Sequence, residues 1–513
     1  MTNREMGSGG FLLPRIYEHK QSKVIDAFKV GNIDFIGDTR WALLDDFLAF
    51  ALKADFFKMA DKSYPSPRAK TEVPIWFLLS CQLILRLLGE VKYSQIKTFL
   101  NSGPILSRLG FNVGVEKIGF NKKNKQKRET PIHHDSVRKF FKDTSSYNLR
   151  EWYLKSVQPW FKSKKTFDSR GIFVLDQTHL VVPDNSNYKN AVKMPVDHFG
   201  QFYWGYSEMT ADQKKVLKHH PCYTLSSLLH LPAQKDFFHV ASYDWGPGNE
   251  DELVQEKRII PSFCERFPGL IKELIVDRGY IDGDTIGKYK KDYGIDTLIP
   301  LKSNMDNYKD ALEIAKSSVW EIIETQKNDN GLLIYQLEGI CIQEMDLWNS
   351  NSQKQNVYIA KETIWDEEKG KHIIKEWVIS SSKKYSSVKV AITRYRIRFQ
   401  IEERYRQFKY SWNLNKFCSP NENLMEAHIC FTLQSYSLLQ LYLRQKDFKD
   451  KTGQFLHSLQ TQNELGKGAV VVYSGNEFAV MDFDKFLCTI LSLSNGPREK
   501  VLQLAEKQLA SKR

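Results

Sequence analysis

The sequence predicts an α/β protein with helical segments at both ends of the chain. Apolar residues recur at helical spacing over much of the first 165 residues, and short β-branched runs alternate with helical stretches over 170–302. Helical periodicity returns after Lys409. A chain of 513 residues is longer than a typical single domain, so we expect several packed units.

Composition narrows the class of protein and of partner. A hydrophobic content of 42% is typical of globular proteins, and a net charge of +13 favours a polyanionic partner. The seven cysteines are scattered, so we expect reduced thiols, a cytoplasmic setting and no structural zinc. No secretory signal is recognisable. The most apolar window, 73–90, contains Gln82 and Arg86, which favours a buried helix over a membrane span.

Residues 1–165 are predicted to form a helical DNA-binding region, with helices within 41–59, 73–101 and 135–161. Between the second and third helices lies a basic loop. Its cationic residues are Lys122, Lys123, Lys125, Lys127 and Arg128. The loop leads into a short basic helix that Asp135 or Ser136 could cap. Loop and helix together suit phosphate contacts, although a solvated charged loop is the alternative.

Residues 166–302 are predicted to form the first part of an α/β core. Strands at 171–176, 222–231 and 237–245 would form a meander, followed by a helix that Asn249 caps and that ends near Arg266. A strand at 272–277, a helix at 286–294 and a strand at 295–301 complete this part.

The remaining chain is divided into three parts. Residues 303–375 read as a β-rich insertion of hairpins, whose last strand continues to about 380 and returns to the main sheet. Residues 376–425 carry a helix rich in charged side chains, and 426–513 are predicted as a helical C-terminal region with a tail helix at 497–511.

Two aspartates follow apolar runs of strand length. Asp176 ends the run 171–176, and Asp277 ends the run 272–277. Ligands of α/β sheets bind at the carboxyl ends of strands, so both acids are placed for a metal rather than for the core. A single aspartate in such a place is most often a turn or cap residue, so neither position is diagnostic alone.

The run 394–410 adds a third acid within the pattern Tyr-x2-Arg-x3-Glu-x6-Lys. In one helix, at about 100° per residue, this spacing gathers one polar face. Its members are Tyr395, Arg398, Glu402 and Lys409. An apolar stripe for packing would lie on another face and comprise Val390, Ile397, Ile401 and Phe408. The alternative is a charged surface helix.

Together these motifs resemble the bacterial insertion-sequence transposases of the DDE type, in the branch with the Tyr-Arg-Glu-Lys signature, insertion-sequence family four. The first acid carries the Asp-x-Thr pattern and the second the pattern Asp-Arg-Gly-Tyr. The loop 247–249 is also similar, and the likeness spans about 170–445. Gln177 departs from the small or acidic residue that related enzymes often have there.

The resemblance implies a ribonuclease-H-like core in which Asp176, Asp277 and Glu402 hold two Mg2+ ions, with Mn2+ as a possible substitute. It also implies that Tyr395, Arg398, Lys409 and Arg278 contact DNA. The implied partners are double-stranded DNA, as transposon ends and target, and a second copy of the chain on that DNA. No membrane association is expected.

In this branch a flipped base stacks on a tryptophan of the β-rich insertion. The candidates here are Trp320, Trp348, Trp365 and Trp377. His179 lies near the first acid and is more readily a structural residue. Two other functions stay open: a non-cleaving DNA-binding regulator descended from a transposase, and a metal-dependent nuclease on the same fold.

Overall fold

The computed structural model describes residues 18–39, 42–69, 73–96, 132–203, 205–206, 209–233, 237–346, 348, 350–445 and 469–509. The basic residues predicted at 122–128 lie outside these ranges. The chain forms two compact units, one from Met1–Lys164 with Gln407–Arg513 and the other from Lys165–Arg406.

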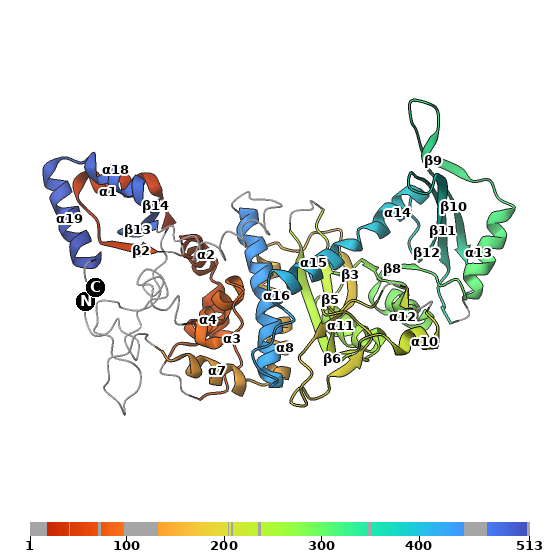
Figure 1. Ribbon diagram of the computed structural model, residues 1–513, viewed down its shortest axis with the longest axis horizontal. Helices are drawn as coiled ribbons and strands as arrows, with labels where there is room; N and C mark the ends of the chain where they lie inside the picture. The colour runs from red at the N-terminus through yellow and green to blue at the C-terminus, as the bar shows by residue number, and fades with distance from the viewer. Residues whose placement is uncertain are drawn as a thin grey trace. The chain divides into compact units, whose positions relative to one another are not determined.

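The unit Lys165–Arg406 is built on a ten-stranded mixed sheet (Figure 1). In chain order its strands are β3 (Ile172–Val181), β4 (Val192–Met194), β5 (His220–His230), β6 (His239–Pro247), β7 (Glu273–Ile275), β8 (Asp296–Pro300), β9 (Glu321–Lys327), β10 (Leu333–Met345), β11 (Gln355–Asp366) and β12 (Lys371–Ser381). The predicted meander is confirmed, because β5 pairs in antiparallel fashion with both β3 and β6. On its other edge β3 pairs in parallel with β7, which pairs in parallel with β8.

The helices of this unit connect and cover the sheet. They are α10 (Ala211–Lys215), α11 (Glu252–Arg266), α12 (Gly283–Tyr293), α13 (Asp306–Lys316), α14 (Val388–Arg396) and α15 (Phe399–Tyr410), the last of which continues into the other unit. Helix α11 packs on β3, β5 and β6. The prediction that Asn249 caps α11 is wrong: Asp251 is the cap, and its carboxylate accepts a hydrogen bond from the backbone N–H of Leu253.

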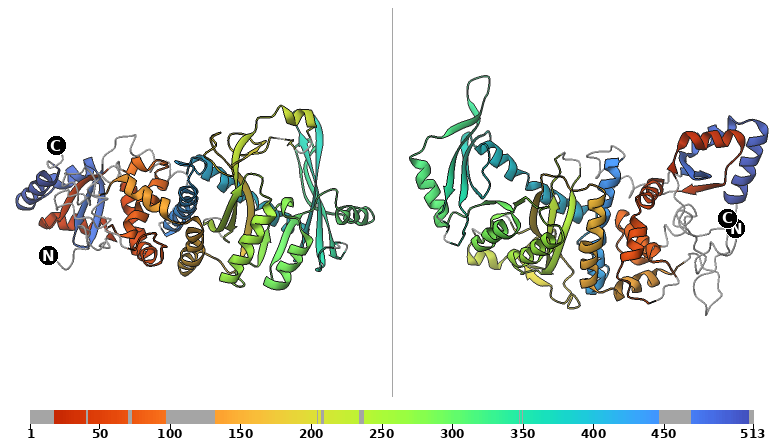
Figure 2. Two further views of the ribbon diagram at one scale, coloured as in Figure 1. Left: turned by 90° about the horizontal axis from the view of Figure 1, so that it is seen from below. Right: turned by 180° about the vertical axis from the view of Figure 1, so that it is seen from behind.

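The hairpins of the predicted insertion continue the main sheet. Strand β12 pairs with β8, with Ile379 opposite Pro300, so the expected return of this strand to the main sheet is confirmed. The predicted boundary at 375 instead falls inside β12, and the segment also contains α13. Helices α13 and α14 both pack on β10 and β11, and the strands lie between them (Figures 1 and 2).

The other unit is largely helical. Its described helices are α1 (Gln21–Val30), α2 (Ala42–Lys53), α3 (Phe56–Ser63), α4 (Ile75–Leu87), α7 (His134–Asp143), α8 (Ser146–Trp152), α9 (Gln158–Ser163), α16 (Glu422–Gln445), α18 (Phe483–Leu491) and α19 (Asn495–Leu509). Residues 424–443 of α16 are all buried, and α2, α4, α7 and α8 pack around them. The apolar window at 73–90 forms the buried helix α4, as predicted. No described helix has the length and apolar content needed to cross a bilayer.

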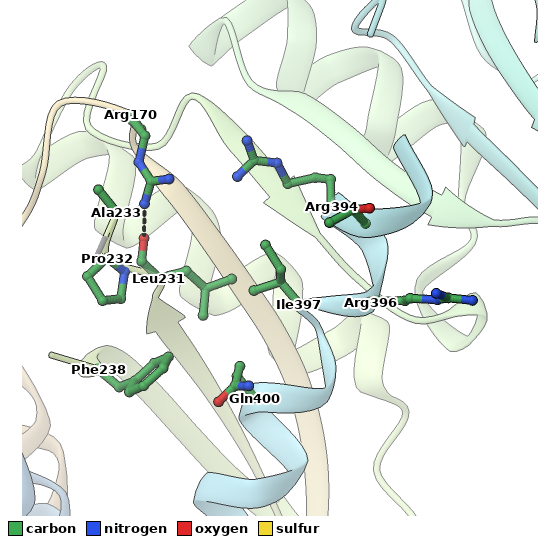
Figure 3. A pocket seen from close by; sticks show the side chains of 10 residues that line it. Arg170, Leu231, Pro232, Ala233, Phe238, Arg394, Arg396, Ile397 and Gln400 are labelled. Atoms are coloured by element: carbon green, nitrogen blue, oxygen red, sulfur yellow. Dashed lines mark hydrogen bonds between the residues drawn. The ribbon is translucent and has the colours of Figure 1, made fainter. Parts of the chain in front are cut away.

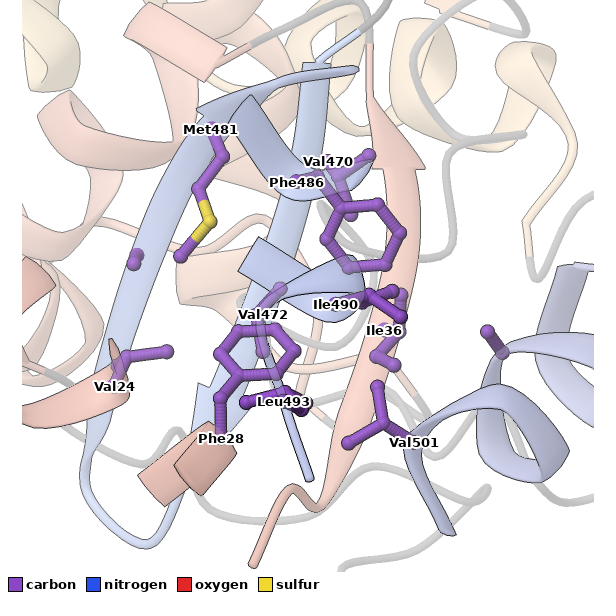
Figure 4. Packing of buried hydrophobic residues seen from close by; sticks show 12 residues of the cluster. Val24, Phe28, Ile36, Val470, Val472, Met481, Phe486, Ile490, Leu493 and Val501 are labelled. Carbon is purple, nitrogen blue, oxygen red and sulfur yellow. The ribbon is translucent and has the colours of Figure 1, made fainter. Parts of the chain in front are cut away.

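A four-stranded sheet, which was not predicted, lies within the two terminal regions that were expected to be mostly helical. Its strands are β1 (Glu18–His19), β2 (Phe35–Thr39), β13 (Ala469–Ser474) and β14 (Glu477–Asp482), in the order β1-β14-β13-β2. Figure 4 shows how Phe28 of α1, Val472 of β13 and Phe486 of α18 share one core with residues of α19. The tail helix α19 therefore belongs to a packed α/β subdomain formed by both ends of the chain. A cap prediction in this unit is also wrong, because His133 caps α7 in place of Asp135 or Ser136.

Candidate active site

Strand register brings Asp176 and Asp277 side by side. The parallel pairing of β3 with β7 stops where Val174 lies opposite Ile275. Asp176 lies two residues after Val174, and Asp277 lies two residues after Ile275. Side chains two residues apart on a strand share a face, so both carboxylates lie at the same edge of this parallel pair. The prediction of a strand end is wrong for Asp176, because β3 continues to Val181 and Asp176 pairs with Ser227 of β5.

One guanidinium joins three carboxylates at this edge. Nη1 of Arg398 lies 3.2 Å from an oxygen of Asp176 and 3.8 Å from an oxygen of Asp277. Nη2 of Arg398 lies 2.6 Å from Glu402. The Arg398 side chain is only 9% exposed, so these charge-assisted contacts are partly shielded from water. Three segments far apart in the chain thus converge on one cation.

The prediction of one continuous helix through these residues is wrong. Helix α14 ends at Arg396 and α15 begins at Phe399, with a turn at Ile397 and Arg398. Arg398 reaches back to Asp176 and Asp277 from this turn, while Glu402 lies in the first turn of α15.

The apolar stripe expected on the same helix forms only in part. Ile401 and Phe408 are buried, as expected. Val390 is 41% exposed, and Ile397 borders a pocket instead of the core. The turn at Ile397 and Arg398 interrupts the helical repeat, so the stripe does not run through from one helix to the next.

Tyrosines fix the geometry of the two aspartates. The hydroxyl of Tyr395 donates to Asp277 at 3.4 Å, and the hydroxyl of Tyr405 donates to the backbone carbonyl of Asp176 at 2.5 Å. Loss of water around Asp176 raises the pKa of its carboxyl to about 7, with Arg398 lowering it and Asp277 raising it. The same carboxylates raise the pKa of Arg398, which therefore stays charged.

Glu252 is a fourth acidic side chain near this cluster, and sequence reasoning did not identify it as a site residue. It begins α11, and a Cβ added to Gly279 would lie 1.6 Å from its Oε1. Burial together with Asp277 and Asp251 raises the pKa of Glu252 to about 7. The sequence gives no signal for the contact between Glu252 and Gly279, because the two residues are distant in the chain and meet only in the folded protein.

The donor set fits a hard divalent cation in its chemistry, since Asp176, Asp277 and Glu402 offer only carboxylate oxygens. When ionised, the three carboxylates carry three negative charges against the single positive charge of Arg398, so the cluster is anionic as it stands. In the described residues, three ligand atoms within 4.8 Å of one another occur only in the group His133, His134 and Asp135, which belongs to the other unit, on α7 and its cap. Arg398 lies between the three acids, so metal binding there requires its guanidinium to turn away.

A pocket of about 330 Å³ lies beside the acids, and one of the candidate tryptophans lines it. We call it the tryptophan pocket; Asp277, Arg278, Trp377, Tyr395 and Arg398 are among its lining residues. The indole N–H of Trp377 is buried and has no hydrogen-bond partner among the described residues. The rings of Trp377 and Tyr395 meet edge to face, with centroids 6.3 Å apart. Of the four tryptophans considered from sequence, only Trp377 lines this pocket.

The other predicted residues have distinct surroundings. Arg278 is exposed at the rim of the tryptophan pocket. Lys409 belongs to the unit that contains Gln407–Arg513, where it is buried. Gln177 donates to the side chain of Gln255 at 3.2 Å, and His179 is buried against the carbonyl of Gly248 at 3.1 Å. His179 is therefore a structural residue.

Comparison with known proteins adds one family. Residues 168–438, more than half of the chain, match the family model described as transposase DDE domain. No curated protein matches the chain.

Proposed function

Since the chain belongs to the transposase DDE domain family, we propose that it cuts the ends of a mobile DNA element and joins their 3′ ends to target DNA. The family implies a DNA-binding, metal-dependent DNA-cleaving enzyme. We further propose the insertion-sequence branch with the Tyr-Arg-Glu-Lys signature and a ribonuclease-H-like core. The sheet order β6-β5-β3-β7-β8, with the acids on β3, after β7 and on α15, supports that core.

The observation that carries the proposal is the convergence of Asp176, Asp277 and Glu402 on the single guanidinium of Arg398. Burying a charge is costly unless it is paired, and clusters of carboxylates around one largely buried cation are typical of functional sites. A site of three carboxylates is anionic until cations enter, so it is suited to metal and then to a phosphodiester.

In the proposed mechanism the three carboxylates hold divalent ions, Mg2+ or Mn2+. When bound, such ions activate a water or 3′-hydroxyl and stabilise the leaving oxygen. Arg398 leaves the carboxylates and forks onto a DNA phosphate, which keeps the charge of the site balanced. Tyr395 orients Asp277, and Tyr405 holds the strand that carries Asp176.

The tryptophan pocket supports a second element of the proposal. A base unstacked at the cut end would lie against Trp377, between the acids and the last strand of the insertion. The basic residues at 122–128 and the exposed Arg278 are proposed to contact DNA phosphates, whereas the burial of Lys409 argues against such a contact in this conformation. A homodimer is proposed to hold the two ends together.

The test uses duplexes that carry the inverted repeats flanking the gene, incubated with Mg2+ or Mn2+. Asp176→Asn, Asp277→Asn and Glu402→Gln are each expected to lower cleavage by at least about a thousandfold, because a metal ligand contributes several kcal/mol to the transition state. Binding of the same duplex in EDTA is expected to stay within about twofold.

Glu403→Gln is the matched control, because Glu403 is the next residue on α15 and pairs with Arg406 rather than Arg398. Full cleavage by any one of the three acid variants would remove that residue from the site. Joining of liberated 3′ ends to a second duplex separates a transposase from a nuclease that only hydrolyses DNA. Wild-type binding without any cleavage would instead support a regulator.

A further inference from the structure

A second pocket, of about 260 Å³, lies at the junction of α14 and α15. We call it the arginine pocket. From the junction it is lined by Thr393, Arg394, Arg396, Ile397 and Gln400, and from the start of β3 and the β5–β6 connection by Arg170, Leu231, Pro232, Ala233 and Phe238. Residues interleaved with these, Tyr395, Arg398 and Phe399, line the tryptophan pocket. The junction is therefore a wall shared by two pockets.

The two ends of the arginine pocket differ in chemistry. Figure 3 shows the guanidinium groups of Arg170 and Arg394 at one end, Leu231 and Ile397 in the middle, and Phe238 with Gln400 at the other end. Arg396 points away from this cavity and pairs with Glu362 at 2.7 Å. The cavity thus runs from a cationic end across an apolar floor to an aromatic ring and an amide.

The cationic end carries more positive charge than its partners neutralise. Arg170 pairs with Asp168 at 3.2 Å. Nε of Arg394 lies 3.3 Å from Glu273, but the same buried carboxylate also pairs with Lys383 at 2.7 Å. One carboxylate therefore serves two cations, and no acidic residue lines the pocket. The terminal nitrogens of Arg394 donate to no described residue, which leaves them available to an anion.

We propose that the arginine pocket binds one unpaired nucleotide of a DNA strand. Its phosphate lies between Arg170 and Arg394, since guanidinium forks match phosphate oxygens. Its base lies on Leu231 and Ile397 and meets Phe238 and Gln400, because apolar and aromatic surfaces accept any base and an amide both donates and accepts. The cavity volume of about 260 Å³ lies just below the range of about 300–1,000 Å³ common for small-molecule sites, so it has room for one nucleotide and not for a base pair.

The choice of DNA as the polyanion rests on the proposed function, whereas the pocket and its charge do not.

The first test is binding of a fluorescent oligothymidylate, followed by anisotropy in EDTA so that no cleavage occurs. Arg170→Ala is expected to weaken binding about tenfold, the loss typical of a charge-assisted hydrogen bond. Arg170→Lys keeps the charge without the fork and is expected to fall in between.

Arg266→Ala is the matched control, because Arg266 is an exposed arginine of the same unit on α11 and lines neither pocket. It removes the same charge and is expected to change binding by less than about twofold. Thermal unfolding of each variant checks that the fold is intact. Equal losses in Arg170→Ala and Arg266→Ala, or no loss in Arg170→Ala, would overturn the proposal.

A second pair of probes tests the place of the base. Gln400→Ala is expected to weaken binding of the oligothymidylate but not of an abasic oligonucleotide of equal length. Equal losses on both probes would contradict a base at Gln400. Displacement of the strand by equimolar thymidine monophosphate would assign the pocket to a free nucleotide and overturn the strand assignment.

These measurements separate the two proposals. Arg170-dependent binding in a protein that cuts no duplex would leave the pocket standing and remove the transposase mechanism. If the protein cleaves and joins DNA but Arg170→Ala does not change single-strand binding, the transposase mechanism stands and the pocket assignment falls.

Discussion

Glu256 makes the stability of the sheet-containing unit depend on pH. The side chain lies on α11 with 3% exposure, and its Oε2 has no hydrogen-bond partner among the described residues. Burial, with Asp282 and Glu252 nearby, raises the pKa of Glu256 from 4.5 to about 8, while Lys257 lowers it. The folded protein therefore keeps a proton that the unfolded chain releases above pH 4.5.

The sign and size of the effect follow from linkage. Below about pH 4.5 Glu256 is protonated in both the folded and the unfolded state, so its ionisation does not affect stability. Between pH 4.5 and 8 only the unfolded state ionises, which lowers the free energy of that state and so lowers the free energy of unfolding. Each pH unit above 4.5 lowers the free energy of unfolding by about 1.4 kcal/mol, so the loss at pH 7 is about 3 kcal/mol. Glu256→Gln resembles the protonated acid and is expected to raise the free energy of unfolding by about 3 kcal/mol at pH 7 and by almost nothing at pH 4.

Urea unfolding followed by circular dichroism at pH 4, 7 and 8.5 measures this difference. Glu265→Gln is the control, since Glu265 is exposed near the end of the same helix. The reasoning is refuted if Glu256→Gln gives the same stability change at pH 4 as at pH 7, or if Glu265→Gln reproduces its pH dependence.

Two further predictions compare matched residues. Gly171 and Gly269 both have positive φ, but a Cβ on Gly171 would lie 2.4 Å from the carbonyl of Leu270, whereas Gly269 faces open space. In urea unfolding Gly269→Ala is expected to cost about 1 kcal/mol and Gly171→Ala at least about 3 kcal/mol, and equal costs would contradict a clash at Gly171. Trp377→Ala is expected to lower end cleavage at least about tenfold while leaving duplex binding unchanged. It is also expected to reduce the fluorescence change of a 2-aminopurine placed at the cut end, because that base would no longer stack. An equal effect of Trp365→Ala would argue against a specific stack on Trp377.

The sequence predicted the elements of the main sheet better than their extent. Apolar runs of strand length marked β3, β5, β6, β7 and β8, because buried strands need such residues. Their ends were less visible. Asp176 is polar, which reads as the end of a strand, yet β3 continues because β5 supplies partners on its other edge through Val181.

The residues of the candidate site were visible in the sequence, but their contacts were not. The spacing of Tyr395, Arg398 and Glu402 suggested one helical face, while the turn at Ile397 has no proline or glycine to announce it. Glu252 and Trp377 come close to the acids only through tertiary packing. No local pattern marks such residues, because their partners are distant in the chain.

The terminal sheet was missed for a related reason. Strand β2 pairs with β13, which also forms a hairpin with β14. The β-branched run Val470–Val472 ahead of Gly475 is a local strand signal that the helical prediction for 426–513 overlooked. The pairing of β2 with β13, by contrast, joins segments at opposite ends of the chain and cannot be read from either segment alone.

That pairing also constrains the order in which the protein is completed. Strand β2 ends at Thr39, and β13 starts at Ala469. At translation rates of about 5–20 residues per second, β2 waits roughly 20–90 s for its partner to leave the ribosome. During that interval the nascent chain displays an unpaired edge, and premature termination anywhere ahead of Ala469 would leave it so permanently.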